Sequence, residues 1–414
     1  MTARELSADE LPEAIDRALR GDSILILPAA RTGAVTEAAP SSWTGPGPAP
    51  ALILFTSGST GQAKAVALSA HALTTSARAT ERSLSGAGAW HLCLPVNHIA
   101  GFQVELRARL AGRPPVRTAS ARFTAASFAA EVDELLHRAG SRPTYTSLVP
   151  TQLHRILADD HATALASRID HILLGGAAIS PALLDSAAEA GLSLVRTYGM
   201  SETAGGCVYN GVPFDGVDIT ITEAGTIDLA GPVVADAYVE VTADGTIAAV
   251  DSPGLEADGS GRRIVHTSDL GRLDHGVLTV LGRADDIIVS GGTNVSPHAL
   301  ETGLLPSWQR AGVAEVLVTW VPDAEWGKQV VALVRLADGD EGTADATPVS
   351  AAESPRELAR RLTGLDHGMS GQLLPQLVFP VDEIPSRSIG KPDRKAAAKI
   401  AADLNARRTE YPCR

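Results

Sequence analysis

The chain has 414 residues, a length that predicts more than one domain. Of these residues 44% are hydrophobic and 20% charged, as is typical of globular proteins. Its formal net charge of −13 argues against a nucleic-acid-binding protein, because such proteins displace counterions with basic stripes. The cysteines, Cys93, Cys207 and Cys413, show neither a metal-binding spacing nor a disulfide framework. Since no run of about 18 apolar residues and no apolar signal core occur, we expect a cytoplasmic protein without a membrane span.

Taken in chain order, the first predicted elements are a helix over residues 6–20 and a buried strand in "SILILPA". Residues 31–50 are rich in Pro, Gly, Ser and Thr, which predicts a loop. Short β-branched runs then alternate with alanine-rich helices. These helices are predicted near 69–84, after Gly101 and from Pro181. The alternation predicts an α/β fold with largely parallel sheets.

The pattern changes after about residue 211, where "GVDITITEAGTIDLAGPVVADAYVEVTADGTIAAV" alternates apolar and polar residues between Ala-Gly and Asp-Gly turns. This pattern predicts antiparallel β-hairpins. A last segment with helices and strands begins near residue 283. Residues 337–355 within it are of low complexity, which predicts a disordered surface loop.

A glycine- and hydroxyl-rich stretch, "FTSGSTGQAKA" at residues 55–65, lies between a predicted strand and a predicted helix. It fails the Walker pattern, because Gln62 follows Gly61 and Ala65 follows Lys64. Glycines nevertheless allow a backbone to close round phosphate oxygens, to which hydroxyls and amide N–H groups donate hydrogen bonds. A flexible linker would not be expected directly after a buried strand. The stretch therefore predicts a phosphate-binding loop.

The stretch resembles the phosphate loop of the adenylate-forming enzymes, [ST]-[ST]-G-[ST]-[ST]-G-x-P-K, with Ala63 in place of the proline. This superfamily includes acyl-CoA synthetases, luciferases and peptide-synthetase adenylation domains. Because only 55 residues precede Thr56, we expect the first part of the large domain to be abbreviated compared with typical members. The resemblance implies that ATP is bound by Thr56, Ser57, Gly58, Ser59, Thr60, Gly61 and Lys64.

The stretch "TYGMSET", residues 197–203, is similar to the Y-G-x-[ST]-E motif of the same superfamily. The resemblance implies that Tyr198 stacks on adenine, Glu202 binds Mg²⁺ and Thr203 acts in catalysis at the α-phosphate. These roles suit a flat ring and a hard carboxylate. The resemblance also implies backbone contacts with ATP at Gly176, Ala177 and Gly199. It places Gly175, Met200 and Ser201 beside the acyl substrate.

Three later motifs extend the resemblance in the expected order. "TSDLG" supplies Asp269, which would accept both ribose hydroxyls, and "GRADD" supplies Arg283, which would also contact the ribose. Asp285 would be the hinge between two domains. "SRSIGKPDRKA" supplies the catalytic Lys391, which would offset the negative charge that develops as the acid attacks the α-phosphate.

The fold implied by the resemblance is α/β with two domains. Residues 1–283 would form a large N-terminal domain of mostly parallel sheets flanked by helices, with a small β-barrel-like part. Residues 284–414 would form a small, mobile α+β C-terminal domain. An acid would react with MgATP to give an acyl-adenylate, and the thiol of free coenzyme A would then displace AMP. The path for this thiol would be lined by Ser290, Gly291 and Gly292.

The acid is suggested by "LPVNHIAGFQVELRARLAG", residues 94–112, which resembles the o-succinylbenzoate–CoA ligases of menaquinone biosynthesis. The resemblance implies that His98, as a substrate and catalytic residue, and Arg107 line the acyl pocket. The acid carries a second carboxylate, for which an arginine is a natural partner. Nine residues on one helix would set His98 and Arg107 on opposite faces, unless the helix begins at Gly101. Arg109 remains an alternative partner.

Several alternatives stay open. An aryl- or fatty-acid CoA ligase would share every ATP-binding residue and differ only in its acyl pocket. A peptide-synthetase adenylation domain would need an acidic residue for the substrate amine and a neighbouring carrier domain. A non-catalytic nucleotide sensor would not need Lys391. Self-association into a homo-oligomer and the role of residues 337–355 are also open.

Overall fold

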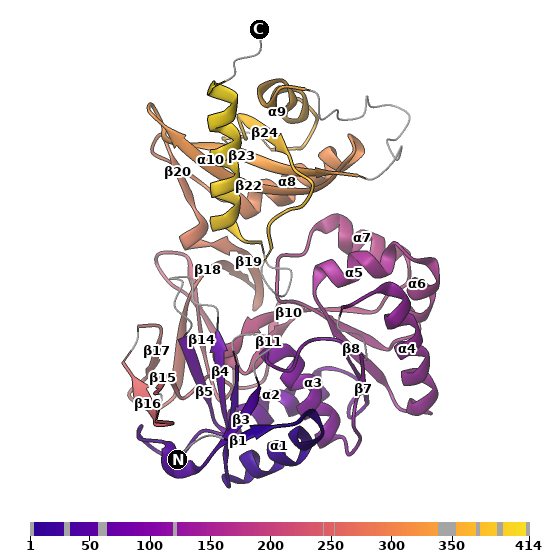
Figure 1. Ribbon diagram of the computed structural model, residues 1–414, viewed down its shortest axis with the longest axis vertical. Coiled ribbons are helices and arrows are strands. Elements are labelled where there is room, and N and C mark those ends of the chain that lie inside the picture. The colour runs from indigo at the N-terminus through magenta and orange to yellow at the C-terminus, as the bar shows by residue number, and fades with distance from the viewer. Residues whose placement is uncertain are drawn as a thin grey trace. The chain divides into compact units, whose positions relative to one another are not determined.

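A computed structural model describes residues 4–28, 34–56, 64–118, 122–242, 244–251, 253–337, 353–369, 373–386 and 392–410. The chain divides into two compact units (Figure 1). The larger unit comprises Met1–Gly176, Ser186–Thr267 and Arg272–Thr279. The smaller unit comprises Ala177–Asp185, Ser268–Gly271 and Val280–Arg414. The domain limits expected from the sequence, 1–283 and 284–414, stay a prediction.

The N-terminal helix is shorter than the predicted span of 6–20. Strand β1 (Arg4–Leu6) and a 3₁₀ turn, η1 (Ala8–Glu10), come before helix α1 (Leu11–Arg20). The Glu10 carboxylate accepts hydrogen bonds from the backbone N–H and the hydroxyl of Ser7, both at 2.9 Å. This reciprocal cap fixes the 3₁₀ turn and delays the start of the α-helix.

The first sheet of the larger unit has the strand order β1-β3-β2-β4-β5-β15-β16. Its remaining strands are β2 (Ile24–Leu27), β3 (Val35–Ala38), β4 (Leu52–Thr56), β5 (Lys64–Leu68), β15 (Ala237–Val241) and β16 (Ile247–Val250). Among its pairs only β2–β4 is parallel, so the expectation of parallel pairing was wrong for this sheet. The loop predicted over 31–50 was also wrong in part, because β3 pairs with β2 there.

The second sheet has the order β12-β11-β10-β9-β8-β6-β7, and its pairs from β10 to β7 are parallel, as predicted. Its strands are β6 (Ala89–Leu92), β7 (Val116–Arg117), β8 (Thr144–Leu148), β9 (His171–Leu174), β10 (Leu194–Met200), β11 (Gly205–Tyr209) and β12 (Val212–Pro213). After α1, the α-helices that the structure describes up to residue 189 are α2 (Ala70–Ser83), α3 (Ile99–Leu110), α4 (Ala125–Ala139), α5 (Pro150–Leu157), α6 (Asp160–Ala166) and α7 (Pro181–Glu189). The helix predicted near 69–84 is confirmed.

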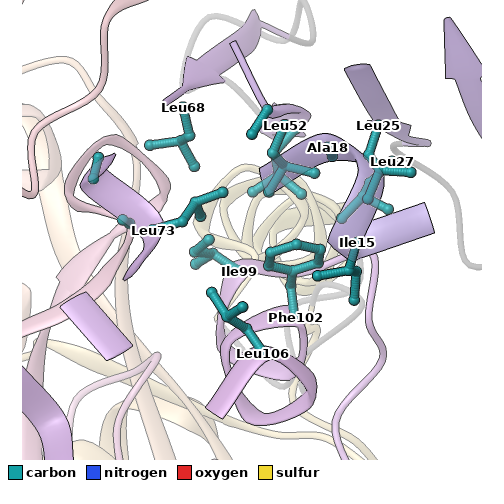
Figure 2. Packing of buried hydrophobic residues seen from close by; sticks show 14 of the residues in the cluster. Ile15, Ala18, Leu25, Leu27, Leu52, Leu68, Leu73, Ile99, Phe102 and Leu106 are labelled. Carbon is teal, nitrogen blue, oxygen red and sulfur yellow. The ribbon is translucent and has the colours of Figure 1, made fainter. Parts of the chain in front are cut away.

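Helices α3 and α4 cover opposite faces of the second sheet, as consecutive residues of β6 show. The ring of Trp90 faces Arg107 of α3, and His91 bonds to Glu131 of α4. Successive side chains of a strand point to opposite faces, so the two helices lie on different sides. The other side of α3 packs against the first sheet. Figure 2 shows Phe102 and Leu106 among residues of α1, β2 and β4 in one apolar core.

A third sheet contains the first of the predicted hairpins, and the second belongs to the first sheet. The third sheet has the order β13-β14-β18-β17, with β19 paired to β18. The strands are β13 (Asp218–Ile221), β14 (Thr226–Ala230), β17 (Leu255–Ala257), β18 (Arg263–Asp274) and β19 (Val277–Arg283). The antiparallel pairs β13–β14 and β15–β16 confirm the hairpins that the Ala-Gly and Asp-Gly turns indicated. The α/β class is confirmed for the chain as a whole.

The smaller unit is built on the sheet β22-β23-β24, with a separate β20–β21 hairpin. Its further elements are η4 (Ala284–Asp286), β20 (Ile288–Ser290), β21 (Thr293–Val295), α8 (Pro297–Arg310), β22 (Val313–Asp323), β23 (Gly327–Leu336), α9 (Pro355–Thr363), β24 (Leu377–Pro380) and α10 (Arg394–Glu410). Val330 packs with α8 and α9, whereas Val331 packs with α10, so helices cover both faces of this sheet. Most of the predicted loop at 337–355 lies outside the described residues.

Candidate functional site

The predicted phosphate loop joins two paired strands. Strands β4 and β5 run antiparallel, and Thr56 of β4 pairs with Lys64 of β5. Both ends of the loop are therefore fixed in the first sheet. The predicted ATP-binding residues between them, Ser57, Gly58, Ser59, Thr60 and Gly61, lie outside the described residues, as does the predicted catalytic Lys391.

Several predicted site residues lie at one edge of the second sheet. Strands β6, β8, β9 and β10 are parallel, and their carboxyl ends lead to His98, Val149, Gly175 and Gly199–Met200. Ligands of open α/β sheets bind at this edge. The arrangement brings His98, Gly175 and Met200, three of the predicted acyl-pocket residues, to one edge of the sheet.

Glycine is needed at 175 and 199 because neighbouring strands approach closely. A Cβ at Gly175 would lie 2.2 Å from Oγ1 of Thr197, and one at Gly199 would lie 2.2 Å from the carbonyl oxygen of Gly205. Gly176 has φ +81°, a conformation that favours glycine. Ala177 belongs to the smaller unit. The predicted contacts of these residues with ATP and substrate stay predictions.

Strand β10 ends in a 3₁₀ turn, η3 (Ser201–Thr203), that carries the predicted magnesium ligand. The hydroxyl of the fully buried Thr203 donates to the carbonyl of Gly205 at 2.7 Å and accepts from the backbone N–H of Met200 at 2.9 Å. Thr203 therefore holds the turn in shape. Its predicted catalytic contact with the α-phosphate stays a prediction.

The Glu202 carboxylate is half-buried and forms none of the ion pairs found in the described part of the chain. Its Oε1 accepts a hydrogen bond from the Tyr238 hydroxyl at 3.1 Å. Burial, together with this carboxylate, raises the pKa of Tyr238. Mg²⁺ is commonly bound by one or two carboxylates plus substrate phosphates, so a carboxylate without a cationic partner fits the predicted role.

Tyr238 was not among the residues predicted from the sequence. It lies on β15, which pairs with β5, the strand that follows the phosphate loop. Tyr238 thus links the predicted magnesium ligand to the sheet that holds that loop. No motif marks it, and the only sequence signal is its place in the predicted hairpin region.

His98 is the N-cap residue of α3, with an extended backbone (φ −111°). The helix predicted to begin after Gly101 in fact begins at Ile99. Gly101 lies inside the first turn, where a Cβ would approach the carbonyl oxygen of Pro95 to 2.2 Å, so this glycine permits packing and does not start the helix. Since His98 lies just outside the helix, the objection that it faces away from Arg107 loses its force.

Arg107 lies on the face of α3 that is turned towards strand β11. Ile99 and Gln103 of this face are the side chains nearest to Gly205 of β11, and Arg107 comes one turn later. Its guanidinium carbon is 5.4 Å from the centre of the Trp90 ring. Arg107 is 3% exposed, and burial lowers the pKa of its guanidinium, which Tyr209 of β11 and Glu81 only partly offset.

The buried Arg107 has no carboxylate at ion-pair distance within the described residues, and its Nε is buried without a hydrogen bond. Arg109, the alternative, is bound through two nitrogens to the carboxylate of Asp16 on α1. A buried cation without an anion is costly unless a ligand supplies one. The geometry therefore favours Arg107 over Arg109 as a ligand-binding group, although the contact itself stays a prediction.

The predicted ribose and hinge residues form one ionic cluster in the smaller unit. The Arg283 guanidinium donates to both carboxylate oxygens of Asp285 at 2.8 Å and to Asp269 at 3.2 Å. The Asp285 carboxylate raises the pKa of Arg283 further above its usual range. The structure thus brings these three residues together, while their contacts with ATP stay a prediction.

The predicted thiol path lies on the turn between β20 and β21. Gly291 has φ +53°, and a Cβ there would lie 2.2 Å from the ring of Trp326, whose carbonyl accepts the Gly291 N–H at 3.0 Å. Ser290 is buried and Gly292 has φ +81°. The indole ring therefore requires glycine at the tip of this turn.

Two broader searches cover the described residues only. No helix there is both long and apolar enough to cross a bilayer. No group of three or more His, Cys, Asp or Glu side chains there could hold a metal ion.

Comparisons with known proteins point to one enzyme family. Residues 4–254 match the family model described as AMP-binding enzyme. A probable 2-succinylbenzoate–CoA ligase of Mycobacterium tuberculosis is 38% identical over 353 residues, which cover 84% of each chain. The 2-succinylbenzoate–CoA ligase of Listeria monocytogenes is 27% identical, over 83% of this chain and 68% of the relative.

Solved structures show the same fold. The o-succinylbenzoate CoA synthetase of Bacillus subtilis, in complex with its acyl-adenylate intermediate, has a TM-score of 0.63 at 26% identity, over 84% of this chain and 69% of that one. ATP-bound MatB of Rhodopseudomonas palustris has a TM-score of 0.67 at 24% identity, over 86% and 69% of the two chains. From the family match and the mycobacterial relative together, the chain belongs to the AMP-binding enzyme family.

Proposed function

We propose that this protein is an o-succinylbenzoate–CoA ligase that acts in menaquinone biosynthesis. As a member of its family it is an AMP-forming ligase that uses ATP, Mg²⁺ and coenzyme A. The choice of acid is supported by the names of its relatives and by the buried Arg107. We assign the reaction to the cytoplasm, where ATP and coenzyme A are available.

The reaction has two steps. One carboxylate of the acid attacks the α-phosphorus of ATP, an acyl–phosphate bond forms, and pyrophosphate leaves. The coenzyme A thiolate then attacks the acyl carbon, a thioester forms, and AMP leaves. Phosphate anhydride formation is needed because a carboxylate is a poor acyl donor.

The chain's own groups have separate tasks in the first step. Arg107 binds the second carboxylate, Glu202 takes part in binding the magnesium ion, and Lys391 offsets the negative charge that develops at the α-phosphate. The bound magnesium ion offsets negative charge on the phosphates. Tyr238 holds the Glu202 carboxylate by its hydrogen bond of 3.1 Å.

The observation that carries the choice of acid is the position of Arg107, which has no carboxylate at ion-pair distance among the described residues. It follows His98 by nine residues on α3, or roughly 13 Å along a helix at 1.5 Å per residue. An acid that reacts at the sheet edge and also meets Arg107 must be elongated and carry a second anionic group. An aromatic keto-dicarboxylate has both properties, whereas benzoate and a fatty acid have only one carboxylate.

The test is acid-dependent release of pyrophosphate and formation of the CoA thioester. Each is measured with MgATP and o-succinylbenzoate, beside benzoate and a medium-chain fatty acid, with Lys391→Ala as the blank. We expect turnover with o-succinylbenzoate far above the other two acids. Turnover with another acid alone would contradict the proposed substrate and favour the aryl- or fatty-acid ligase. No release with any acid would favour the sensor.

A further inference from the structure

Arg394, the first residue of α10, is the centre of a partly buried ionic cluster in the smaller unit. Its guanidinium donates to both oxygens of Glu301 on α8, at 2.7 and 2.9 Å, and to Asp286 on η4 at 2.9 Å. It also donates to the carbonyl of Val318 on β22 at 3.1 Å. We call Arg394, Asp286 and Glu301 the Arg394 cluster.

The cluster is more than a surface ion pair. The Arg394 and Glu301 side chains are 20% and 14% exposed, and Glu301 also accepts the backbone N–H of Val318 at 2.8 Å. Burial opposes the charge on Arg394, but Glu301 and Asp286 outweigh it and raise the pKa of the guanidinium. A planar fork that meets a carboxylate with two parallel bonds has a fixed orientation. The start of α10 is therefore held to α8, η4 and β22 at once.

In the same region, backbone bonds join the residues that come before and after the segment that carries Lys391. We call these joined residues the base of the segment. Ser386 and Pro392 form an antiparallel bridge, and the backbone N–H of Asp393 donates to the carbonyl of Pro385 at 2.8 Å. Residues 387–391 connect the two sides of this bridge and lie outside the described residues. The bridge ends only two residues before Arg394, so the Arg394 cluster anchors one side of that base.

The anchor leads directly to the predicted hinge. Asp285 and Asp286 are consecutive residues of η4 with different partners. Asp285 binds Arg283 of the predicted ribose cluster, whereas Asp286 binds Arg394. One short turn thus holds the ribose-binding groups through one carboxylate and the base of the lysine segment through the next.

We propose that Arg394 is a positioning residue, which through Asp286 and Glu301 fixes the base of the Lys391 segment relative to the hinge turn. The proposal rests on the proposed ligase function and on the predicted role of Lys391. It assigns Arg394 no contact with substrate. It follows that Arg394 serves the adenylation step, in which Lys391 acts, and not the thiol step.

The first test separates the two half-reactions. Adenylation is measured as acid-dependent exchange of pyrophosphate into ATP, and the thiol step as thioester formation from supplied acyl-adenylate and coenzyme A. We expect Arg394→Lys and Asp286→Asn to slow adenylation at least about tenfold and to change the thiol step less than about threefold. Equal losses in both half-reactions would contradict the proposal.

A double-mutant comparison tests whether Arg394 acts through the lysine. Because a lost lysine cannot be mispositioned, Arg394→Lys added to Lys391→Ala should cause no further loss of adenylation beyond that of Lys391→Ala alone. If the losses of adenylation in the two single variants multiply in the double variant, the proposal is overturned. Arg335→Lys is the matched control, because Arg335 of β23 pairs with Glu315 of β22 in the same unit and not with a residue of the Arg394 cluster, and it should leave adenylation unchanged.

Amide hydrogen exchange provides a readout that needs no turnover. In peptides that span residues 384–394, Arg394→Lys and Asp286→Asn should speed exchange at least about tenfold, with the core of β22 unchanged. Unchanged exchange in both variants would refute the anchor, whatever acid the enzyme uses. If wild-type enzyme adenylates another acid, the proposed substrate fails and the anchor is tested with that acid. If one of the two variants unfolds as a whole, the exchange rates of the other variant test the anchor.

Discussion

Two arginines, the fully buried Arg107 and the partly buried Arg394, have opposite surroundings. Arg107 in the larger unit is 3% exposed, lies over the Trp90 ring and has no carboxylate at ion-pair distance among the described residues. Arg394 in the smaller unit meets two carboxylates and a backbone carbonyl. Two similar side chains therefore have very different electrostatic costs.

The difference distinguishes an arginine that can bind a ligand from one that stabilises the fold. A buried charge costs several kcal/mol unless an anion compensates it, and of the two arginines it is Arg394 that has carboxylates at ion-pair distance among the described residues. Arg107 is thus the better candidate for binding an external anion. Arg394 is the better candidate for holding protein segments in place.

The largest expected effect is on the use of the acid. Arg107→Met should lower kcat/KM for o-succinylbenzoate at least about 100-fold, because the second carboxylate would be buried without its cation. Arg109→Met is the matched control on the same helix, and we expect a change within about threefold because Arg109 binds Asp16. Similar losses in both variants, by steady-state kinetics, would break the contrast between the two positions.

The two arginines should also differ in their effect on stability. Arg394→Met leaves the carboxylates of Glu301 and Asp286 without their cation, so we expect a loss of about 2 kcal/mol in the free energy of unfolding of the smaller unit. Arg107→Met removes an uncompensated charge and should cost less than about 1 kcal/mol or stabilise the larger unit. Urea unfolding followed by unit-specific hydrogen exchange measures both. The reverse order would contradict the account.

His91 is a third cationic group, fully buried, and it extends the comparison of charged groups to the dependence of stability on pH. Its Nε2 lies 2.8 Å from the Glu131 carboxylate, and its Nδ1 lies 3.1 Å from the Thr146 hydroxyl. Burial opposes protonation of His91, but Cys93 and Glu131 outweigh it and raise its pKa to about 9. The resulting stabilisation is fully present below the unfolded-state pKa of about 6.5 and is lost as pH rises through about 9.

Glu131→Gln tests this pairing. The variant should lose about 2 kcal/mol of stability near neutral pH and much less at about pH 10, where His91 is neutral in both proteins. Chemical unfolding across this pH range provides the measurement. A loss that does not change with pH would show that Glu131 acts through packing or hydrogen bonding alone.

The smallest expected effect concerns the neighbour of the magnesium ligand. Tyr238→Phe removes one hydrogen bond to Glu202 and should weaken the apparent affinity for Mg²⁺ about tenfold or less, without changing the preference between acids. The magnesium dependence of AMP formation measures this. A changed acid preference would place Tyr238 in the acyl pocket.

Local sequence signals predicted much of the fold. The Ala-Gly and Asp-Gly turns marked the hairpins, since such turns depend on neighbouring residues only. The start of α3 was misplaced because Gly101 was interpreted as the start of the helix. Glycine is needed there because the chain packs closely against Pro95, and no local pattern reveals this contact. Strand β3 was missed because pairing with β2 outweighs a loop-like composition.

The candidate site shows the same division. Glu202 and Arg107 could be selected by motif and family resemblance, and the structure adds that neither has an ion-pair partner in the part of the chain that it describes. Tyr238 and the Arg394 cluster could not be selected as supports, because their partners lie 36 and up to 108 positions away in the chain. Such distant pairs become visible only in the folded protein.

The most direct test of the central claim is a substrate comparison with the wild-type enzyme. We would compare kcat/KM for o-succinylbenzoate with that for an analogue that keeps the reacting carboxylate and lacks the other one. If the buried Arg107 binds the second carboxylate, the analogue should be poorer by at least about 100-fold. Equal values for the two acids would contradict the account, because Arg107 would then have no part in the choice of substrate.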